Sequence, residues 1–413
     1  MKLNCLGGFR EVGKNAVLVE AKKKIMFDYG VKVETGEMPI MPKSVDALVL
    51  NHAHLDHVGS APALYKRQKP DIFSTITTFE LGDMILRDSL KIARIEHKKK
   101  NFDRKEMERM KKSRVEITYG QNYEGDGYTL EFFNAGHIPG SFCCILEIEG
   151  KRIFYTSDFN TDTTRLLKGA NIKTKDIDVL IMESTYSNRD HPPRKETDKG
   201  FFNAVQDTVS NGGVAVIPSF AIGRAAEVLM TIDSFKPDFP VYLDGMARSA
   251  TEISLDHPEF IRDPKALRKA FRRARVVDSD IMRKKVIKDP CAIVTTSGLL
   301  EGGPSVRYVK SLYNNVESSI IFTGFLIPKT AGRYLVDTGR FVTEGFDLKI
   351  KMNIQKFDFS AHTGRDGLFN FVNKMNPEKV VCLHGDYCER FASELRGRGF
   401  DAIAPVNGDV VDL

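Results

Sequence analysis

The chain has 413 residues, of which 42% are apolar and 28% are charged, and its formal net charge at pH 7 is +6. These values exclude a disordered or fibrous chain, and the length predicts either two domains or one large domain with an insertion. No stretch approaches the ~18 apolar residues that a transmembrane helix needs, and the amino terminus has no apolar signal core. We therefore expect a cytoplasmic protein without a membrane partner.

Short apolar runs separated by turns open the chain. They predict β-strands at residues 3–6, 16–20, 24–27 and 45–50, and Asp28 ends the third of them. Further on, residues 79–112 have a strongly helical composition. Within this region, residues 87–114 hold twelve Lys or Arg against five Asp or Glu, a charge run that the solvated face of a long helix would explain.

The fourth strand stops at the sequence Asn51-His52-Ala53-His54-Leu55-Asp56-His57. Three imidazoles and a carboxylate within six residues are costly to crowd together unless a cation holds them. In α/β and sandwich scaffolds, catalytic and binding residues also lie on loops beyond the carboxyl ends of strands. Zinc suits this mixture of nitrogen and oxygen ligands, so the stretch predicts a metal site.

The same order, an apolar run followed by a candidate ligand, returns along the chain. The candidates placed in this way are His137, Asp158, Glu183, His362 and His384. The repetition predicts sheets with one crowded edge at which several loops converge.

Between about residues 187 and 358, strands alternate with helices, as in the strand predicted at 213–218 and the helix predicted at 224–235. Such alternation is typical of a largely parallel sheet with flanking helices. Because candidate ligands lie on both sides of this block, we interpret it as an inserted α/β domain. The predicted organisation is a first domain made of residues 1–186 and 359–413, with residues 187–358 inserted.

The candidate ligands fall into two sets that share one aspartate. His52, His54, His137 and Asp158 would hold one ion, and Asp56, His57, Asp158 and His384 would hold the other. Two zinc ions about 3.5–4 Å apart clamp both oxygens of an in-line displacement at phosphorus and lower the pKa of water. Because protein ligands alone leave positions for water and substrate, the sets predict a hydrolytic centre with two Zn2+ per chain.

Three further residues are candidates for supporting the chemistry. His362, in Ser-Ala-His-Thr, is the candidate proton donor for the leaving alkoxide, with Glu183 orienting it. A core histidine satisfied by its neighbours would explain His362 equally well. Asp28 is expected to orient a ligand histidine by contacting the side of its ring away from the metal, rather than to bind metal itself. Asp56 is counted with the catalytic residues, because its replacement by Ala is expected to abolish cleavage.

The inserted block contains three turns rich in glycine and hydroxyl groups. The candidate backbone-contacting residues in these turns are Arg224, Ser297, Gly298, Thr330, Gly332 and Arg333. Glycine lets backbone amides approach an anion, although short α/β loops are often made this way. Residues 262–288 also hold eleven Lys or Arg against three Asp. Since such cations dominate sequence-independent binding, we expect contact with a polyphosphate backbone.

Together these residues resemble the β-CASP branch of the metallo-β-lactamase superfamily, specifically the nuclease subunit of the cleavage and polyadenylation specificity factor and its archaeal relatives. Asp28, the box at residues 52–57, His137 and Asp158 match the superfamily motifs, and Glu183, His362 and His384 match the three motifs that define the branch. The resemblance covers essentially the whole chain. It implies a metallo-β-lactamase αββα sandwich with an inserted, mainly parallel α/β domain, and zinc-dependent hydrolysis of RNA.

The resemblance also bears on substrate and partners. Members that act on DNA usually carry an aliphatic residue where this chain has His384, which favours RNA. Asn51, Gly364 and Asp386 depart from the usual residues without removing a ligand. Members cleave internally, digest from the 5′ end, or do both, and the resemblance implies a homodimer or a subunit of a larger RNA-processing complex. Because the chain begins with lactamase-type strands, substrate choice is expected to come from the cleft or from partners.

Three other functions stay open. A small-molecule hydrolase of the glyoxalase or lactamase type would use the same zinc box, but the basic insert would then have no purpose. A DNA nuclease is disfavoured by His384. A catalytically inactive scaffold is expected to lack metal ligands, and here all of them are present.

Overall fold

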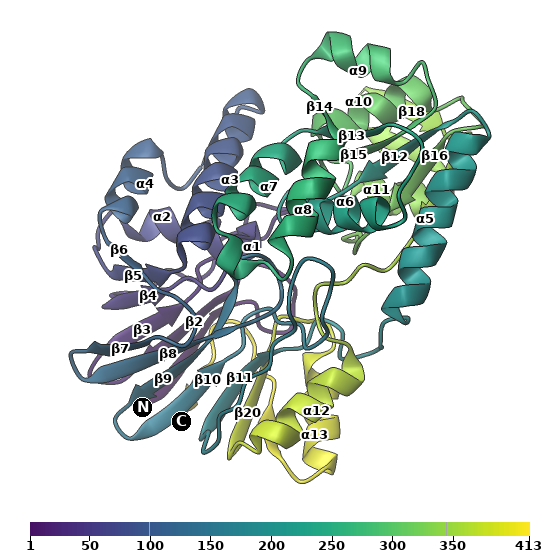
Figure 1. Ribbon diagram of the computed structural model, residues 1–413. Coiled ribbons are helices and arrows are strands. Elements are labelled where there is room, and N and C mark those ends of the chain that lie inside the picture. The colour runs from purple at the N-terminus through teal and green to yellow at the C-terminus, as the bar shows by residue number, and fades with distance from the viewer. Residues whose placement is uncertain (99, 344) are drawn as a thin grey trace. The chain divides into compact units, whose positions relative to one another are not determined.

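A computed structural model describes residues 1–98, 100–343 and 345–413, and the chain divides into two compact units (Figure 1). The first unit consists of residues 1–163, 169–190 and 361–413, and the second consists of residues 164–168 and 191–360. The predicted α/β class with mainly parallel pairing in the inserted block is confirmed. The domain boundaries expected at residues 187 and 358 stay a prediction.

Two seven-stranded sheets build the first unit. The first sheet has the order β22-β1-β2-β3-β4-β5-β6, and the second has the order β21-β20-β11-β10-β9-β8-β7. The strands of the first sheet are β1 (Lys2–Gly7), β2 (Ala16–Glu20), β3 (Lys24–Phe27), β4 (Ala47–Val49), β5 (Asp71–Ser74), β6 (Arg114–Glu116) and β22 (Val410–Asp412). Those of the second are β7 (Asn122–Gly125), β8 (Tyr128–Asn134), β9 (Phe142–Ile148), β10 (Lys151–Tyr155), β11 (Val179–Glu183), β20 (Lys379–Leu383) and β21 (Asp401–Ile403).

Three apolar layers hold these sheets and their helices together. One core, with Phe27, Phe132 and Tyr155, lies between the sheets. A second core fills the outer face of the first sheet beneath α1 (Leu55–Val58), α2 (Ala61–Leu64), α3 (Ile76–Ile95) and α4 (Arg104–Lys111). A third fills the outer face of the second sheet beneath α12 (Arg365–Met375) and α13 (Cys388–Gly397). The first unit is therefore an αββα sandwich, with the two helical layers on opposite sides (Figure 1).

The predicted helical stretch at residues 79–112 is two helices rather than one. After α3 ends, the chain restarts at Asp103, whose side chain accepts a hydrogen bond from the backbone of the next helix while Glu106 reaches back to the backbone N–H of Asp103. This capping box begins α4. Within the described residues, no helix is both long and apolar enough to cross a bilayer.

The second unit is built on a six-stranded sheet of order β14-β13-β15-β12-β16-β19, in which every pairing is parallel. Its strands are β12 (Val214–Pro218), β13 (Val241–Asp244), β14 (Arg275–Val277), β15 (Cys291–Thr295), β16 (Ser319–Phe322) and β19 (Asn353–Lys356), and β17 (Arg340–Thr343) pairs with β18 (Phe346–Lys349). Helices cover both faces of the sheet. They are α5 (Arg194–Ser210), α6 (Arg224–Ser234), α7 (Ala247–Asp256), the 3-10 turn Pro258–Phe260, α8 (Pro264–Arg273), α9 (Asp280–Val286), α10 (Gly303–Leu312) and α11 (Ala331–Thr338).

Candidate metal centre

The predicted ligands come from the carboxyl ends of several strands of the first unit. His52 and His54 follow β4, and Asp56 and His57 lie in the short helix α1 directly after them. The other three ligands follow β8, β10 and β20, and are His137, Asp158 and His384. Since the sheets face each other, these ends meet at one edge of the sandwich.

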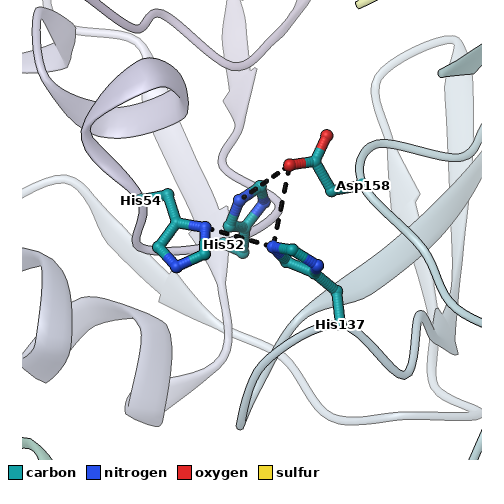
Figure 2. Close-up of side chains that lie close together, drawn as sticks. All are labelled: His52, His54, His137 and Asp158. Atoms are coloured by element: carbon teal, nitrogen blue, oxygen red, sulfur yellow. Dashed lines mark hydrogen bonds and ion pairs between the residues drawn. The ribbon is translucent and has the colours of Figure 1, made fainter. Parts of the chain in front are cut away.

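One set of ligands surrounds a common point (Figure 2). The Nε2 atoms of His52 and His137 lie 3.6 and 3.7 Å from Oδ2 of Asp158. Nδ1 of His54 lies 3.1 Å from Nε2 of His137. One ligand atom from each of the four residues lies within 4.8 Å of the others, which is the crowding that a single bound cation requires.

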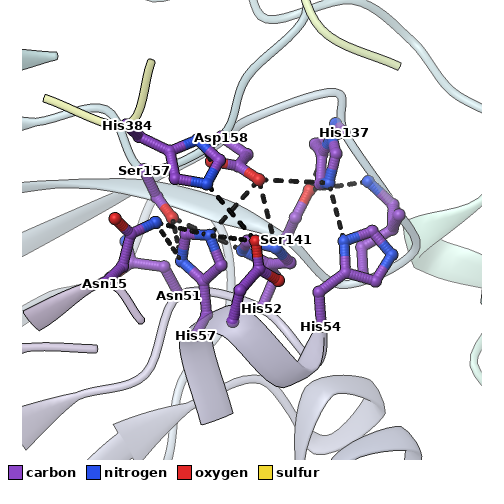
Figure 3. A network of polar contacts seen from close by, with 12 residues as sticks. Asn15, Asn51, His52, His54, His57, His137, Ser141, Ser157, Asp158 and His384 are labelled. Carbon is purple, nitrogen blue, oxygen red and sulfur yellow. Dashed lines mark hydrogen bonds and ion pairs between the residues drawn. The ribbon is translucent and has the colours of Figure 1, made fainter. Parts of the chain in front are cut away.

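A second set surrounds an adjacent point and shares Asp158 with the first (Figure 3). Oδ2 of Asp158 lies 3.3 Å from Nε2 of His57, and its Oδ1 lies 3.2 Å from Nδ1 of His384. Oδ2 of Asp56 lies 3.3 Å from Nε2 of His384 and 3.9 Å from Nε2 of His57. The two sets thus meet at one carboxylate.

The chemistry of the first set fits a metal ion. Nε2 of His52 is buried and has no hydrogen-bond partner among the described residues, an arrangement that is costly unless a ligand completes it. Burial lowers the pKa of His52 and His137 well below its usual value, and lowers that of His54 to about 4. Burial alone would raise the pKa of Asp158, but the neighbouring imidazoles, His384 first, hold it well below its usual value. Neutral imidazoles beside an ionised carboxylate are the forms that bind zinc.

The second set favours a positive charge. Burial alone would lower the pKa of His57, but the carboxylates of Asp158, Asp28 and Asp56 raise it well above its usual value. Burial likewise opposes the ionised form of Asp56, yet the charges of His57 and His384 lower its pKa. Three carboxylates around one buried imidazole stabilise a cation at this point, whether a proton or a metal ion.

Asp28 lies behind the second set and orients His57. It directly follows β3 and is fully buried. Its Oδ2 accepts hydrogen bonds from Nδ1 of His57 at 2.8 Å, from the hydroxyl of Tyr155 at 3.0 Å and from that of Ser157 at 3.2 Å. Its Oδ1 accepts one from the backbone N–H of Asn51 at 2.9 Å. Because Nδ1 is the nitrogen that donates to Asp28, the neutral ring would present the lone pair of Nε2 to a metal ion that replaces the Nε2 proton.

Two other ligand histidines have oxygen partners of the same kind. Nδ1 of His137 donates to the backbone carbonyl of Ala361 at 2.9 Å. Nδ1 of His384 lies 3.1 Å from the hydroxyl of Thr185, which also donates to the backbone carbonyl of His384 at 3.1 Å. These contacts fix the ring orientations before any ligand is added.

His362 and Glu183 form a third group beside the first set. Nδ1 of His362 lies 2.9 and 3.0 Å from the two carboxylate oxygens of Glu183, the last residue of β11. The backbone N–H of Phe159 also donates to this carboxylate. Burial alone would lower the pKa of His362, but Glu183 raises it to about 9. Its imidazole ring lies 4.6 Å from the ring of His137, so a protonated histidine stands next to the first ligand set.

Comparisons with known proteins give the family. Residues 17–185 match a metallo-beta-lactamase superfamily domain, residues 225–335 a Beta-Casp domain, and residues 347–405 a Zn-dependent metallo-hydrolase RNA specificity domain. "Probable RNase MJ4" of Methanocaldococcus jannaschii is 34% identical, with all of both chains covered. The chain belongs to the β-CASP branch of the metallo-β-lactamase superfamily.

Other relatives of this β-CASP protein are also archaeal. "RNase aCSPSF2" of Saccharolobus solfataricus is 34% identical over all of this chain and 85% of its own. "Transcription termination factor FttA" of Pyrococcus abyssi is 31% identical over all of this chain and 71% of its own. A crystal structure of a protein of unknown function from Enterococcus faecalis matches with a TM-score of 0.60 at 14% identity, covering 100% of this chain and 99% of that one, which shows the shared fold.

Asn15 is a residue of the centre that sequence reasoning missed. It is buried in the turn before β2, and its amide nitrogen lies 2.7 Å from Nε2 and 3.4 Å from Nδ1 of His57. The amide therefore packs against the imidazole ring instead of lying in line with one lone pair. Gly8 permits this position, because a Cβ there would lie 1.9 Å from Oδ1 of Asn15. A polar residue just before an apolar strand was the only available signal.

The six candidate backbone-contacting residues all lie in the second unit, and neighbouring contacts explain several of them. A Cβ on Gly332 would lie 2.9 Å from the carbonyl of Leu299. Thr330 caps α11 by accepting from the N–H of Arg333, whose guanidinium pairs with Asp337 at 2.7 Å. A Cβ on Gly298 would lie 3.1 Å from the backbone nitrogen of Phe220. Arg224 begins α6, and Ser297 accepts a hydrogen bond from the N–H of Leu299. Their RNA-binding role stays a prediction.

Proposed function

We propose that this β-CASP protein is a ribonuclease that hydrolyses RNA phosphodiester bonds at a centre of two zinc ions. The observation that carries the proposal is the pair of ligand sets that share Asp158. A shared carboxylate keeps two cations close enough to act on one phosphoryl group. A centre with a single ligand set would support many other hydrolases equally well.

The choice of RNA rests on the relatives and on one residue. Two relatives that match this whole chain are named as RNases, and residues 347–405 match a domain described by RNA specificity. His384 stands where members acting on DNA usually carry an aliphatic side chain, and it lies in the second ligand set. These observations support RNA over DNA and over a small ester or lactam.

Each residue of the centre has a defined task. The seven ligands are His52, His54, Asp56, His57, His137, Asp158 and His384. Zinc held by them would lower the pKa of water and offset the negative charge that develops on the phosphoryl oxygens. Asp28 holds His57 in the tautomer that presents Nε2 to the second ligand set.

His362 serves as the proton donor. Because Glu183 raises its pKa to about 9, the imidazole is protonated at neutral pH, and its contact with the His137 ring keeps it beside the first ligand set. From there it can give its proton to the leaving alkoxide as the P–O bond breaks. Before this transfer, Glu183 stabilises the positively charged ring and fixes its direction.

Cleavage of end-labelled RNA tests the proposal. The zinc-loaded protein should degrade RNA, lose activity with a chelator and regain it with zinc, while a matched DNA strand and a thioester should remain intact. Preferential hydrolysis of the thioester or of DNA would overturn the proposal. Product lengths on 5′-monophosphate and 5′-hydroxyl RNA will separate internal cleavage from digestion at the 5′ end. The proposed homodimer is tested by light scattering of the purified protein, and membership of a larger RNA-processing complex stays a prediction.

A further inference from the structure

Helix α3 starts at the metal centre. Thr75 caps the helix by accepting from the N–H of Thr78, and its hydroxyl donates to the carbonyl of Gly140 at 2.9 Å, in the loop that carries His137. The same helix packs against α1, which carries Asp56 and His57. The first turns of α3 are thus fixed to both ligand-bearing segments.

Further along, α3 and α4 border a hollow of about 280 Å3, lined by Arg87, Arg104, Met107 and Glu108. Arg87 stands eleven residues after Ile76, the first residue of α3. At 1.5 Å per residue, it lies about 16 Å along the helix from the end that touches the metal centre.

Within the part of the chain that the structure describes, the two arginines of this hollow, Arg87 and Arg104, are not paired with a carboxylate. Among the described residues, neither guanidinium forms a hydrogen bond, an ion pair or a contact with an aromatic ring. The nearby carboxylates form ion pairs with other residues. Asp83 pairs with Lys111 and Arg114, and Glu108 pairs with Lys111 at 3.4 Å. Two unpaired cations beside one hollow repel each other, and a bound anion would remove that cost.

We propose that this α3–α4 hollow binds a backbone phosphate of the RNA, at a point away from the bond that is cut. The inference rests on the proposed function and deepens it. The fork of an arginine suits a phosphate, and exposed Lys91 and Arg94 extend the basic surface along α3 at helical spacing from Arg87. Bound RNA would therefore be held at the metal centre and again on α3.

The test compares Arg87→Gln/Arg104→Gln with the control Lys43→Gln/Lys374→Gln, which removes the same charge from two exposed lysines of the same unit. Affinity for a long unstructured RNA is measured in the full chain, in an Asp158→Ala background that prevents cleavage. Cleavage of the same RNA and of a dinucleotide is measured without that background. At about 3.4 Å per stacked nucleotide, a dinucleotide cannot reach from the centre to Arg87.

The arginine variant should raise the Kd for long RNA about 3- to 10-fold at low salt and leave kcat/KM for the dinucleotide unchanged. The slope of log Kd against log salt should fall by about 1.4, from two contacts at about 0.7 each on a single strand. The melting temperature should not fall, because neither side chain has a partner to lose. The control should leave the Kd and the slope near those of the parent.

Four results would overturn the inference. Equal Kd and slope in the arginine variant and the control would show that the charges are only solvated, and the proposed function would stand if the parent still cleaves RNA. If the arginine variant keeps its affinity for RNA but loses binding of polyglutamate, the hollow binds an acidic protein. If it keeps its affinity for RNA but loses binding of inorganic phosphate, the hollow binds the free anion. If the parent chain neither binds nor cleaves RNA, the proposed function fails as well.

Discussion

Replacing Asp28 by Asn should weaken zinc binding and destabilise the fold, although the two side chains have nearly the same shape. The carboxylate accepts four hydrogen bonds, from His57, Tyr155, Ser157 and the backbone of Asn51. An amide has only one oxygen, so its NH2 group must face at least one of these buried donors. If it faces Asn51, an unsatisfied donor pair costs about 1–3 kcal/mol. If it faces His57, the proton of that ring moves to Nε2 and blocks ligand binding there.

Either orientation predicts a loss of about 10- to 100-fold in zinc affinity, the usual effect of removing an oxygen partner behind a ligand histidine. Competition with a chromophoric chelator measures this affinity, and urea unfolding of the metal-free protein measures the stability. The control is Asp126→Asn, which removes a solvent-exposed ion pair with Lys23 and should leave both the stability and the zinc affinity near those of the parent. Parental zinc affinity in Asp28→Asn would refute the orienting role of this carboxylate.

Three other substitutions test separate parts of the molecule. His362→Ala should slow RNA cleavage while zinc content stays at the parental value; zinc lost in parallel with rate would make His362 a ligand. Glu183→Gln removes the charge that raises the pKa of His362 to about 9, so the alkaline limb of the kcat–pH profile, where the donor loses its proton, should move to lower pH. An unmoved limb would contradict the assignment of the donor. Arg283→Met leaves the buried carboxylate of Asp244 without its bidentate partner and should destabilise the second unit by about 3–5 kcal/mol in urea unfolding; unchanged stability would mean that Tyr308 alone satisfies the carboxylate.

The strands that carry ligands could be read directly from the sequence. Strands β2 and β3 have the bounds that the apolar runs predict. The run before His52 ends in β4, and the runs before His137 and Asp158 end in β8 and β10. A buried strand is visible in the sequence as an apolar run, and a polar ligand residue at the end of the strand ends that run abruptly. That local signal also located Glu183, at the end of β11.

Other features depend on contacts that the sequence does not encode locally. Asn15 meets His57 only after β2 and α1 are packed in the folded unit. Tyr155 lies at the end of an apolar strand, and only the structure shows that its hydroxyl donates to Asp28. The helical composition of residues 79–112 does not show that the region holds two helices, because the start of the second depends on the capping box of Asp103 and Glu106. Composition favours a helix throughout this region, whereas a cap marks where a new helix begins.

The rate of RNA cleavage as a function of zinc bound per chain tests the central claim most directly. The metal-free protein is titrated with zinc while the number of bound ions is counted by native mass spectrometry, and cleavage of labelled RNA is followed at each point. If Asp158 joins two working sites, activity should stay near zero through the first equivalent and rise only as the second ion binds. Full activity with one zinc ion per chain, or with none, would contradict the account.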